Sequence, residues 1–128
     1  MNITSPEFKN IEPKEIINLY RANEWSSADK LCNSHSLITA WYNERLVGLG
    51  NAISDGHLVV YYPHLLVHPD YQGKGIGKMI MDKMQEKYGS FHMQMLIADG
   101  KAIDFYKKNG FERAGQTESM WIYSGGDH

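Results

Sequence analysis

The stretch Val67-His68-Pro69-Asp70-Tyr71-Gln72-Gly73-Lys74-Gly75-Ile76-Gly77-Lys78 decides the fold of this chain. A β-rich run ends within it, Pro69 forces a turn, and glycines then open a segment with helical periodicity. Glycines let a backbone approach a ligand closely, and the free N–H groups in the first turn of a helix favour phosphate oxygens. Lys74 and Lys78 add positive charge. The stretch therefore predicts an anion-binding turn between a strand and a helix.

Two well-known phosphate-binding motifs do not fit these residues. A P-loop requires Gly at the position of Gln72 and Ser or Thr at the position of Met79. A dinucleotide fingerprint that begins at Gly73 requires Gly at the position of Lys78. The pattern that remains is Gln-x-x-Gly-x-Gly, formed by Gln72, Gly75 and Gly77.

Before this turn, the sequence predicts helices followed by strands. The polar segment Met1–Ile11 fits either a short edge strand or a loose tail. Pro13 suits the first turn of a helix, and apolar residues recur on one side of the segment up to Ala22. Ser26 can cap a second short helix that runs through Leu31. An antiparallel meander is then predicted from the β-rich runs Leu37–Tyr42, Leu46–Ile53 and Leu58–Val67.

After the turn, helix and strand signals alternate. Apolar residues recur at three and four positions after Gly75, and Gly89 ends this helix. The segment Phe91–Ala98 predicts a buried strand, because its last four residues are apolar throughout. A helix over Ala102–Lys108 and a final strand over Met120–Tyr123 follow. We expect residues 1–128 to form a single domain.

Composition argues against several classes of protein. Thirteen Lys and Arg and fifteen Asp and Glu are scattered along the chain, without the basic run that nucleic acid attracts. No hydrophobic run approaches the roughly 18 residues that span a bilayer. The single cysteine, Cys32, cannot form an internal disulfide, and no signal-peptide pattern is present. We therefore expect a cytoplasmic protein that binds neither nucleic acid nor membrane. The six histidines lack metal-ligand spacing, so we expect no metal.

The glycine-rich turn closely resembles the coenzyme A signature of the GNAT superfamily of N-acetyltransferases. Gln72, Gly75 and Gly77 carry this likeness, with Leu-Leu-Val-His-Pro-Asp-Tyr before them and an amphipathic helix after them. The segment from Ala102 to Phe111 resembles the second signature of the same superfamily. The resemblance implies an α/β (α+β) fold with a mixed central β-sheet. That sheet would splay apart at the acetyl-CoA site and be flanked by about four helices.

The resemblance also implies how acetyl-CoA binds. The co-substrate would lie between two splayed strands, here Leu58–Val67 and Phe91–Ala98. Backbone groups around Leu66 and Val67 would pair with the pantetheine and polarise the thioester carbonyl. The pyrophosphate would be held by N–H groups of the loop residues Gln72, Gly73, Lys74, Gly75, Ile76, Gly77 and Lys78. The amine would then attack the thioester directly in a ternary complex, so that positioning and oxyanion stabilisation supply most of the acceleration.

Tyr106 is the candidate proton donor. It occupies the position from which members of the superfamily offer a phenol to the departing sulfur of coenzyme A. The alternative is an aromatic side chain that only packs the last helix on the sheet. Asp99 departs from the family pattern, because many relatives carry there an Asn that contacts the cofactor. The acid at Asp99 either weakens that contact or replaces it.

His64 is the candidate base for the acceptor amine. Relatives often place a carboxylate at this position, and a neutral imidazole can also take a proton at physiological pH. The alternative is an imidazole that is only hydrogen-bonded within the sheet. Because side chains alternate along a strand, we expect His64 to share a face with Tyr62 and Leu66. Asp55 falls at a turn and is a weaker candidate. Cys32 lies away from both signatures and is expected to behave as a small buried hydrophobe.

Three functions are compatible with these residues. The first is acetylation of a primary amine of a small molecule, and the second is the same chemistry on a protein or peptide. The third is a noncatalytic acyl-CoA-binding module. Tyr106 argues against the module, which would not need it, and the short chain argues for a small substrate because it offers little extra surface for gripping a protein. Dimers are common in the superfamily, so a homodimer is compatible with the resemblance.

Overall fold

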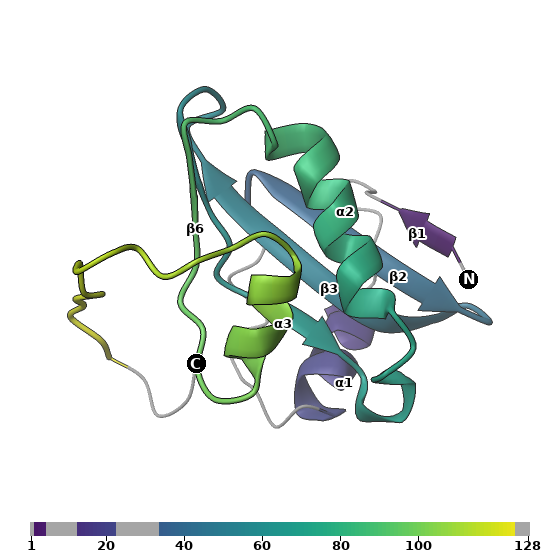
Figure 1. The fold of residues 1–128 in the computed structure, drawn as a ribbon. Helices are drawn as coiled ribbons and strands as arrows, with labels where there is room; N and C mark the ends of the chain where they lie inside the picture. The colour runs from purple at the N-terminus through teal and green to yellow at the C-terminus, as the bar shows by residue number, and fades with distance from the viewer. Residues whose placement is uncertain (1, 5–12, 23–33, 125–128) are drawn as a thin grey trace.

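A mixed β-sheet forms the centre of the computed structural model, which describes residues 2–4, 13–22 and 34–124 (Figure 1). The strand order is β1-β2-β3-β4-β6, and β5 also pairs with β3. All pairs are antiparallel except β4 and β6, which run parallel. The predicted mixed sheet is therefore confirmed. The strands are β1 Asn2–Thr4, β2 Ser36–Tyr42, β3 Arg45–Ser54, β4 Val59–Tyr61, β5 Leu65–Val67 and β6 Met93–Met95.

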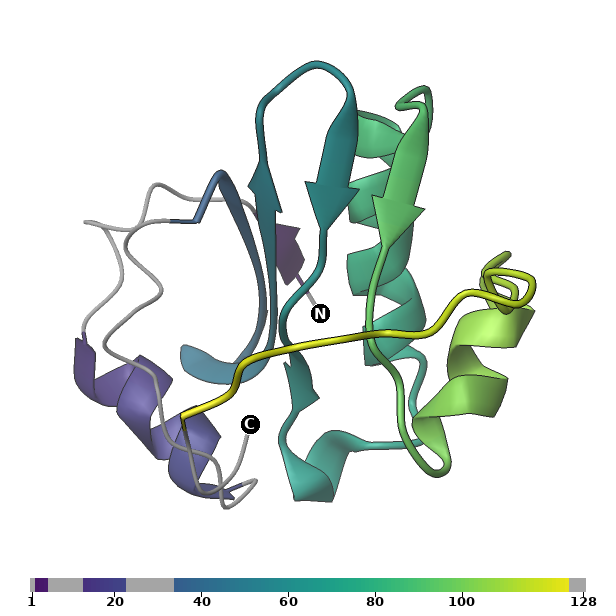
Figure 2. The same ribbon diagram turned by 90° about the vertical axis from the view of Figure 1, so that its left-hand side faces the viewer.

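Helices cover both faces of this sheet. Helix α1 lies on one face, and α2 lies on the other with α3 beside it (Figures 1 and 2). Their bounds agree with the predicted ones: α1 Pro13–Ala22, α2 Ile76–Tyr88 and α3 Ala102–Lys108. The short helix predicted before Leu31 lies outside the described residues. None of the described helices combines the length and the apolar character needed to cross a membrane.

The hairpin between β2 and β3 turns at two residues. Asn43 and Glu44 both have positive φ angles, 49° and 64°. Two successive residues with positive φ match the right-handed twist of the flanking strands, which is why this turn joins them closely. The central part of the predicted meander is thus confirmed.

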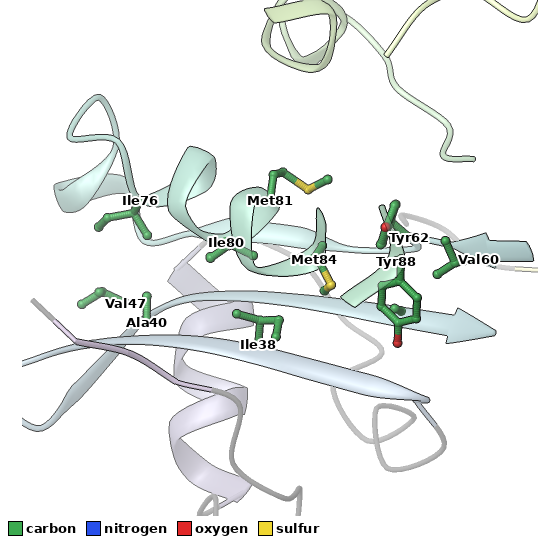
Figure 3. Close-up of a cluster of buried hydrophobic side chains, with 11 residues drawn as sticks. Ile38, Ala40, Val47, Val60, Tyr62, Ile76, Ile80, Met81, Met84 and Tyr88 are labelled. Atoms are coloured by element: carbon green, nitrogen blue, oxygen red, sulfur yellow. The ribbon is translucent and has the colours of Figure 1, made fainter. Parts of the chain in front are cut away.

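The main core lies between α2 and the sheet (Figure 3). Ile76 and Ile80 of α2 lie directly over two glycines of β3. A Cβ atom at Gly48 would lie 2.9 Å from Ile76, and one at Gly50 would lie 2.7 Å from Ile80. The helix can approach the sheet this closely only because β3 has no side chains there. This packing fixes the start of α2, and with it the glycine-rich turn, over the middle of the sheet.

A second core cluster lies on the opposite face, under α1. Its buried residues are Ile16, Leu19, Leu37, Leu46, Leu49 and Leu66. Leu66 belongs to β5, so this strand is held from both sides of the sheet.

The predicted strand Leu58–Val67 is divided in two at Pro63. Relative to β3, β4 and β5 are out of register by one residue. Tyr62 packs in the α2-side cluster, whereas Leu66 packs in the α1-side cluster. The prediction that His64 shares a face with both is therefore wrong. Pro63 has no N–H to donate to the ladder, and a slip of one residue reverses the direction of every later side chain.

The C-terminal strand predictions differ most from the structure. Strand β6 covers Met93–Met95 instead of Phe91–Ala98, and both of these methionines are exposed. The prediction of a buried strand is wrong because β6 is the outermost strand of the described sheet. Residues Met120–Tyr123, predicted as a strand, lie in no regular element and are also exposed.

Candidate functional site

The sheet splits between β5 and β6. Strands β4 and β6 stay paired as far as Met95, whose carbonyl accepts the N–H of Tyr62 at 3.0 Å. Beyond that bond, β5 pairs only with β3, and residues 96–99 belong to no strand. Figure 2 shows the chain after β6 running apart from β5. The predicted splay is therefore present, and it begins beside Tyr62.

The edge of β5 that faces the splay carries the main-chain groups of Val67. Hydrogen bonds to β3 lie at both ends of β5. The N–H of His68 donates to the carbonyl of Val47 at 2.7 Å, and the carbonyl of His64 accepts the N–H of Asn51 at 3.1 Å. Because main-chain groups alternate in direction along a strand, those of Leu66 point to β3 and those of Val67 point away from it. Of the two predicted backbone contacts, only Val67 is placed to meet a ligand in the splay.

Gln72 ties the loop to the end of β5. Its main-chain N–H donates to the carbonyl of Pro69 at 3.4 Å, and its side-chain Nε2 donates to the carbonyl of Val67 at 2.9 Å. The main-chain bond is long, and the role of the Gln72 N–H as a phosphate donor stays a prediction. The side-chain bond fixes the position of the loop, a contact that the sequence pattern alone did not reveal.

The turn after Gln72 leaves room and donors for an anion. Gly73 and Gly75 have φ angles of +78° and +84°, and a Cβ atom at either position would meet nothing within 4 Å. The first bond into helix α2 runs from the N–H of Met79 to the carbonyl of Gly75 at 3.1 Å. The N–H groups of residues 76–78 therefore have no helical partner, and the helix dipole favours negative charge beside them.

The two lysines of the turn differ in their surroundings. Lys78 forms an ion pair with Asp82, with 2.8 Å between Nζ and Oδ2. The Nζ atom of Lys74 lies 5.7 Å from the centre of the Tyr71 ring, and within the described residues it has no carboxylate partner. Lys74 is therefore the cation that is free to attract a phosphate group.

Helix α3 brings Tyr106 to the α2 side of the splay. A Cβ atom at Gly77 would lie 3.1 Å from Phe105, so the absence of a side chain at Gly77 lets α3 pack closely on the start of α2. The Tyr106 ring contacts Phe105 and Phe111, with centroids 5.1 and 5.8 Å apart. Phe111 in turn contacts Tyr62, at 6.2 Å, where the splay begins.

The hydroxyl group of Tyr106 is available to a ligand. It has no hydrogen-bond partner in the described part of the chain, which also contains no buried side-chain oxygen or nitrogen without a partner. The oxygen therefore reaches solvent while the ring is half-buried. Burial raises the pKa of Tyr106 to about 12, because the charged phenolate is poorly solvated there. Tyr106 is thus a neutral hydrogen-bond donor at physiological pH.

His64 lies just before β5, and its side chain belongs to the other side of the sheet. Its main chain is bonded to Asn51, whose Oδ1 accepts the N–H of His64 at 3.0 Å. Alternation along β5 directs the imidazole to the same side as Leu66, which is the α1 side of the sheet. The half-buried His64 and Tyr106 thus lie on opposite sides of the sheet.

Asp55 is poorly suited to proton transfer. Asp55 Oδ1 accepts N–H groups of His57, Leu58 and Val59 at 3.1, 2.9 and 3.3 Å. These bonds, chiefly the one from Leu58, lower the pKa of Asp55 to about 2, so its carboxylate is a very weak base. Asp99 is exposed at the turn before α3, where its carbonyl accepts the N–H of Ala102 at 3.1 Å.

A polar link next to the splay could not be predicted from the sequence. The Tyr62 hydroxyl donates to Oε1 of Gln94 at 2.7 Å, and Gln94 exchanges two hydrogen bonds with Gln85, at 2.7 and 3.0 Å. These bonds join β4, β6 and α2 where the sheet divides. No local pattern marks the two glutamines, because they meet only when β6 lies beside α2.

A sequence profile of the acetyltransferase (GNAT) domain matches residues 33–113. The chain therefore belongs to the GNAT acetyltransferase family.

Relatives and a solved structure agree with this membership. The chain is 33% identical over 90 residues to "Uncharacterized N-acetyltransferase ycf52" of Gracilaria tenuistipitata var. liui, an alignment covering 64% of this chain and 50% of the relative. It is 35% identical over 74 residues to "Histone acetyltransferase TAP1" of Glycine max, an alignment covering 54% of this chain and 31% of that relative. The chain thus spans half the length of these relatives or less. The GNAT family protein SP0256 of Streptococcus pneumoniae TIGR4 superposes with a TM-score of 0.82 at 27% identity, covering 95% of this chain and 97% of that one.

Proposed function

We propose that this chain transfers the acetyl group of acetyl-CoA to a primary amine of a small molecule. The observation that carries the proposal is the splay between β5 and β6. Three groups border it: the outward-facing main chain of Val67, the unpaired N–H groups at the start of α2, and the accessible hydroxyl of Tyr106. An acyl thioester attached to a pyrophosphate requires a polarising donor at its carbonyl oxygen, a proton donor beside its sulfur and an anion site at its pyrophosphate.

The loop residues Gly73–Lys78 would bind the pyrophosphate. Their N–H groups and the dipole of α2 supply the attraction, and the charge of Lys74 adds to it. Val67 would pair with the pantetheine as a neighbouring strand does, and its N–H would polarise the thioester carbonyl. Gln72 would hold these two parts of the site at a fixed separation, because it bonds the Val67 carbonyl from within the loop.

The positions of His64 and Tyr106 support direct attack by the amine. The amine would enter from the α1 side, lose its extra proton to His64 or to water, and form the new C–N bond. The C–S bond would then break on the α2 side, where Tyr106 donates a hydrogen bond to the sulfur as negative charge develops. The coenzyme leaves as the free thiol after taking up one proton, so the reaction needs no side-chain nucleophile.

The first candidate acceptor is a small-molecule amine. The relative named as a histone acetyltransferase supports the alternative, a protein or peptide acceptor with the same chemistry. A noncatalytic acyl-CoA-binding module would leave the hydroxyl of Tyr106 without a purpose. We also propose a cytoplasmic location, which suits a chain with a single cysteine.

A free-thiol assay with acetyl-CoA tests the proposal. The acceptors are polyamines, arylalkylamines, aminoglycosides and histone-tail peptides, and calorimetry measures acetyl-CoA binding in parallel. We expect micromolar to millimolar KM values for at least one small amine. Turnover on the peptides alone would establish the protein-acetyltransferase alternative. Tight binding without thiol release on any acceptor would favour the binding module, and absence of binding would overturn both the site and the function.

A further inference from the structure

Asn51 lies in β3, opposite the segment that connects β4 to β5. It is a buried polar residue, with 4% of its surface exposed. Its amide oxygen Oδ1 accepts the main-chain N–H of His64 at 3.0 Å, and its Nδ2 donates to Oγ of Ser34 at 3.0 Å. The main-chain N–H of Asn51 donates to the carbonyl of His64 at 3.1 Å. Asn51 therefore holds His64 with both its main chain and its side chain.

This contact differs from the regular pairing of two strands. Opposite residues in a hydrogen-bonded antiparallel pair exchange two bonds between their main chains. Asn51 and His64 make one such bond, but the N–H of His64 donates to the side chain of Asn51 in place of its main-chain carbonyl. The amide cannot be turned round, because Nδ2 would then face the N–H of His64 and two donors would meet. The amide oxygen thus takes the part of a main-chain acceptor.

The contact lies where the chain opposite β3 contains one residue more than β3 does. Ile53 pairs with Tyr61, and Gly50 pairs with Leu65. Only residues 51 and 52 lie between the two partners on β3, whereas residues 62, 63 and 64 lie between Tyr61 and Leu65. One extra residue in one strand of a pair is a β-bulge, and side-chain alternation is reversed beyond it.

Core packing limits the position of this extra residue without fixing it. Tyr62 is held in the α2-side cluster before the bulge, and Leu66 is held in the α1-side cluster after it. The extra residue can lie anywhere between them while both side chains keep their places. If it lay at Leu65, alternation from Tyr62 would direct the His64 side chain to the α2 side. The bond from His64 to Asn51 places the extra residue before His64, at Pro63.

We propose that Asn51 is a positioning residue for acetyl transfer. Its amide oxygen holds the extra residue at Pro63 and so keeps the imidazole of His64 on the α1 side of the sheet. This role rests on the proposed function, in which the amine enters from that side and His64 can accept its proton. Asn51 acts only through His64, because its amide is buried and is bonded at both ends. It contributes to the rate without touching the amine or acetyl-CoA.

Scalar coupling across the hydrogen bond tests the contact without a variant or a substrate. In NMR spectra of the unmodified chain, we expect a coupling from the amide nitrogen of His64 to the side-chain carbon Cγ of Asn51. The coupling from the amide nitrogen of Asn51 to the carbonyl carbon of His64 serves as the internal reference, because that bond has a similar length. A coupling from His64 to the main-chain carbonyl carbon of Asn51, or to neither of its carbons while the reference is seen, would overturn the proposal.

A double-mutant cycle tests the role of Asn51 in the reaction. We expect Asn51→Ala and His64→Ala each to lower kcat/KM for the amine by about 10–100-fold, because each removes the base from its place. The double variant should be no slower than His64→Ala alone, since without the imidazole Asn51 has nothing to position. Free-thiol release at saturating acetyl-CoA measures these rates, and circular dichroism establishes that every variant is folded.

Two further variants serve as controls. Thr39→Val removes another buried acceptor, whose Oγ1 receives the Nε1–H of Trp41 at 2.9 Å. This variant should have a lower melting temperature but an unchanged kcat/KM, because Thr39 makes no contact with the bulge. Asn51→Asp keeps an acceptor oxygen for the N–H of His64, and it should lose far less of the rate than Asn51→Ala does.

The rates separate a positioning role from a purely structural one. Additive losses in the double variant would overturn the positioning role, and so would an unchanged rate in Asn51→Ala or an equal loss in Thr39→Val. Full activity in His64→Ala would also overturn it, but acetyl transfer in the same assay would leave the proposed function standing. An unmodified chain that shows the coupling but acetylates no amine would overturn the proposed function and the positioning role that rests on it.

Discussion

Replacing Tyr106 with Phe removes one hydroxyl group and changes little else in the described structure. The ring contacts with Phe105 and Phe111 involve only the aromatic carbons, and the hydroxyl has no internal partner to leave unpaired. We therefore expect Tyr106→Phe to fold normally and to bind acetyl-CoA within a few-fold of the unmodified chain. Any larger effect should appear in the rate of acetyl transfer.

The size of that effect follows from the pKa of the hydroxyl. Burial raises the pKa of Tyr106 to about 12, whereas an ordinary thiol has a pKa of about 8.5. Full transfer of the proton to the thiolate would thus cost about 5 kcal/mol, so Tyr106 must act mainly as a hydrogen-bond donor. A hydrogen bond to a charged group contributes about 1.5–3 kcal/mol. We expect kcat to fall by about 10–100-fold.

The assay is free-thiol release at saturating acetyl-CoA and amine, compared with Tyr42→Phe as a control that changes an exposed tyrosine on β2. The control should keep its kcat. Since the raised pKa keeps Tyr106 protonated below about pH 12, it should cause no loss of rate between pH 8 and 10. Unchanged turnover in Tyr106→Phe would make this residue a packing aromatic. An alkaline loss of rate near pH 10 that disappears in the variant would contradict the effect of burial.

Three other changes test the remaining parts of the site. Gly75→Val places a β-branched residue at a φ of +84° and should abolish the rise in melting temperature with acetyl-CoA, whereas Gly115→Val, at a φ of +63°, should keep it. His64→Ala should remove the acidic fall in rate at subsaturating amine; a fall that persists and follows the basicity of each of two amines would assign the proton loss to water. Asp55 should titrate near pH 2 by carboxyl NMR. Because the pKa is lower in the folded chain, the carboxylate stabilises the fold at pH values above the ordinary pKa of 3.8, and this contribution is lost as the pH falls through about 2. A titration near pH 3.8 would contradict the three N–H bonds.

The sequence predicted the helices and the glycine-rich turn well, because their signals are local. Gly75 and Gly89 bracket α2, and its apolar residues recur with helical spacing between them. The likeness to known signatures then placed the proposed anion site at the start of this helix. What the turn does in detail was less predictable. Whether the N–H of Gln72 is free depends on the carbonyl of Pro69, and no residue pattern records that bond.

The direction of the side chains in β5 was not predicted correctly, because the prediction assumed that side chains alternate without a break across Pro63. A strand keeps its period of two only while its register is continuous, and the shift at Pro63 reverses it. The same shift decides which main chain faces the splay: that of Val67 does, and that of Leu66 does not. Proline marks a break that the sequence displays, but the size of the register shift follows only from the pairing with β3.

Two strand predictions in the C-terminal third of the chain were wrong. Phe91–Ala98 has the composition of a buried strand, and Met120–Tyr123 has that of a paired one, yet in one chain the first is short and exposed and the second is unpaired. Local composition indicates that a segment is suited to burial in a sheet, but it does not say whether the fold supplies a neighbouring strand on each side. In the described structure β6 has a neighbour on one side alone, and residues 120–123 have none, so the apolar side chains of both segments are exposed.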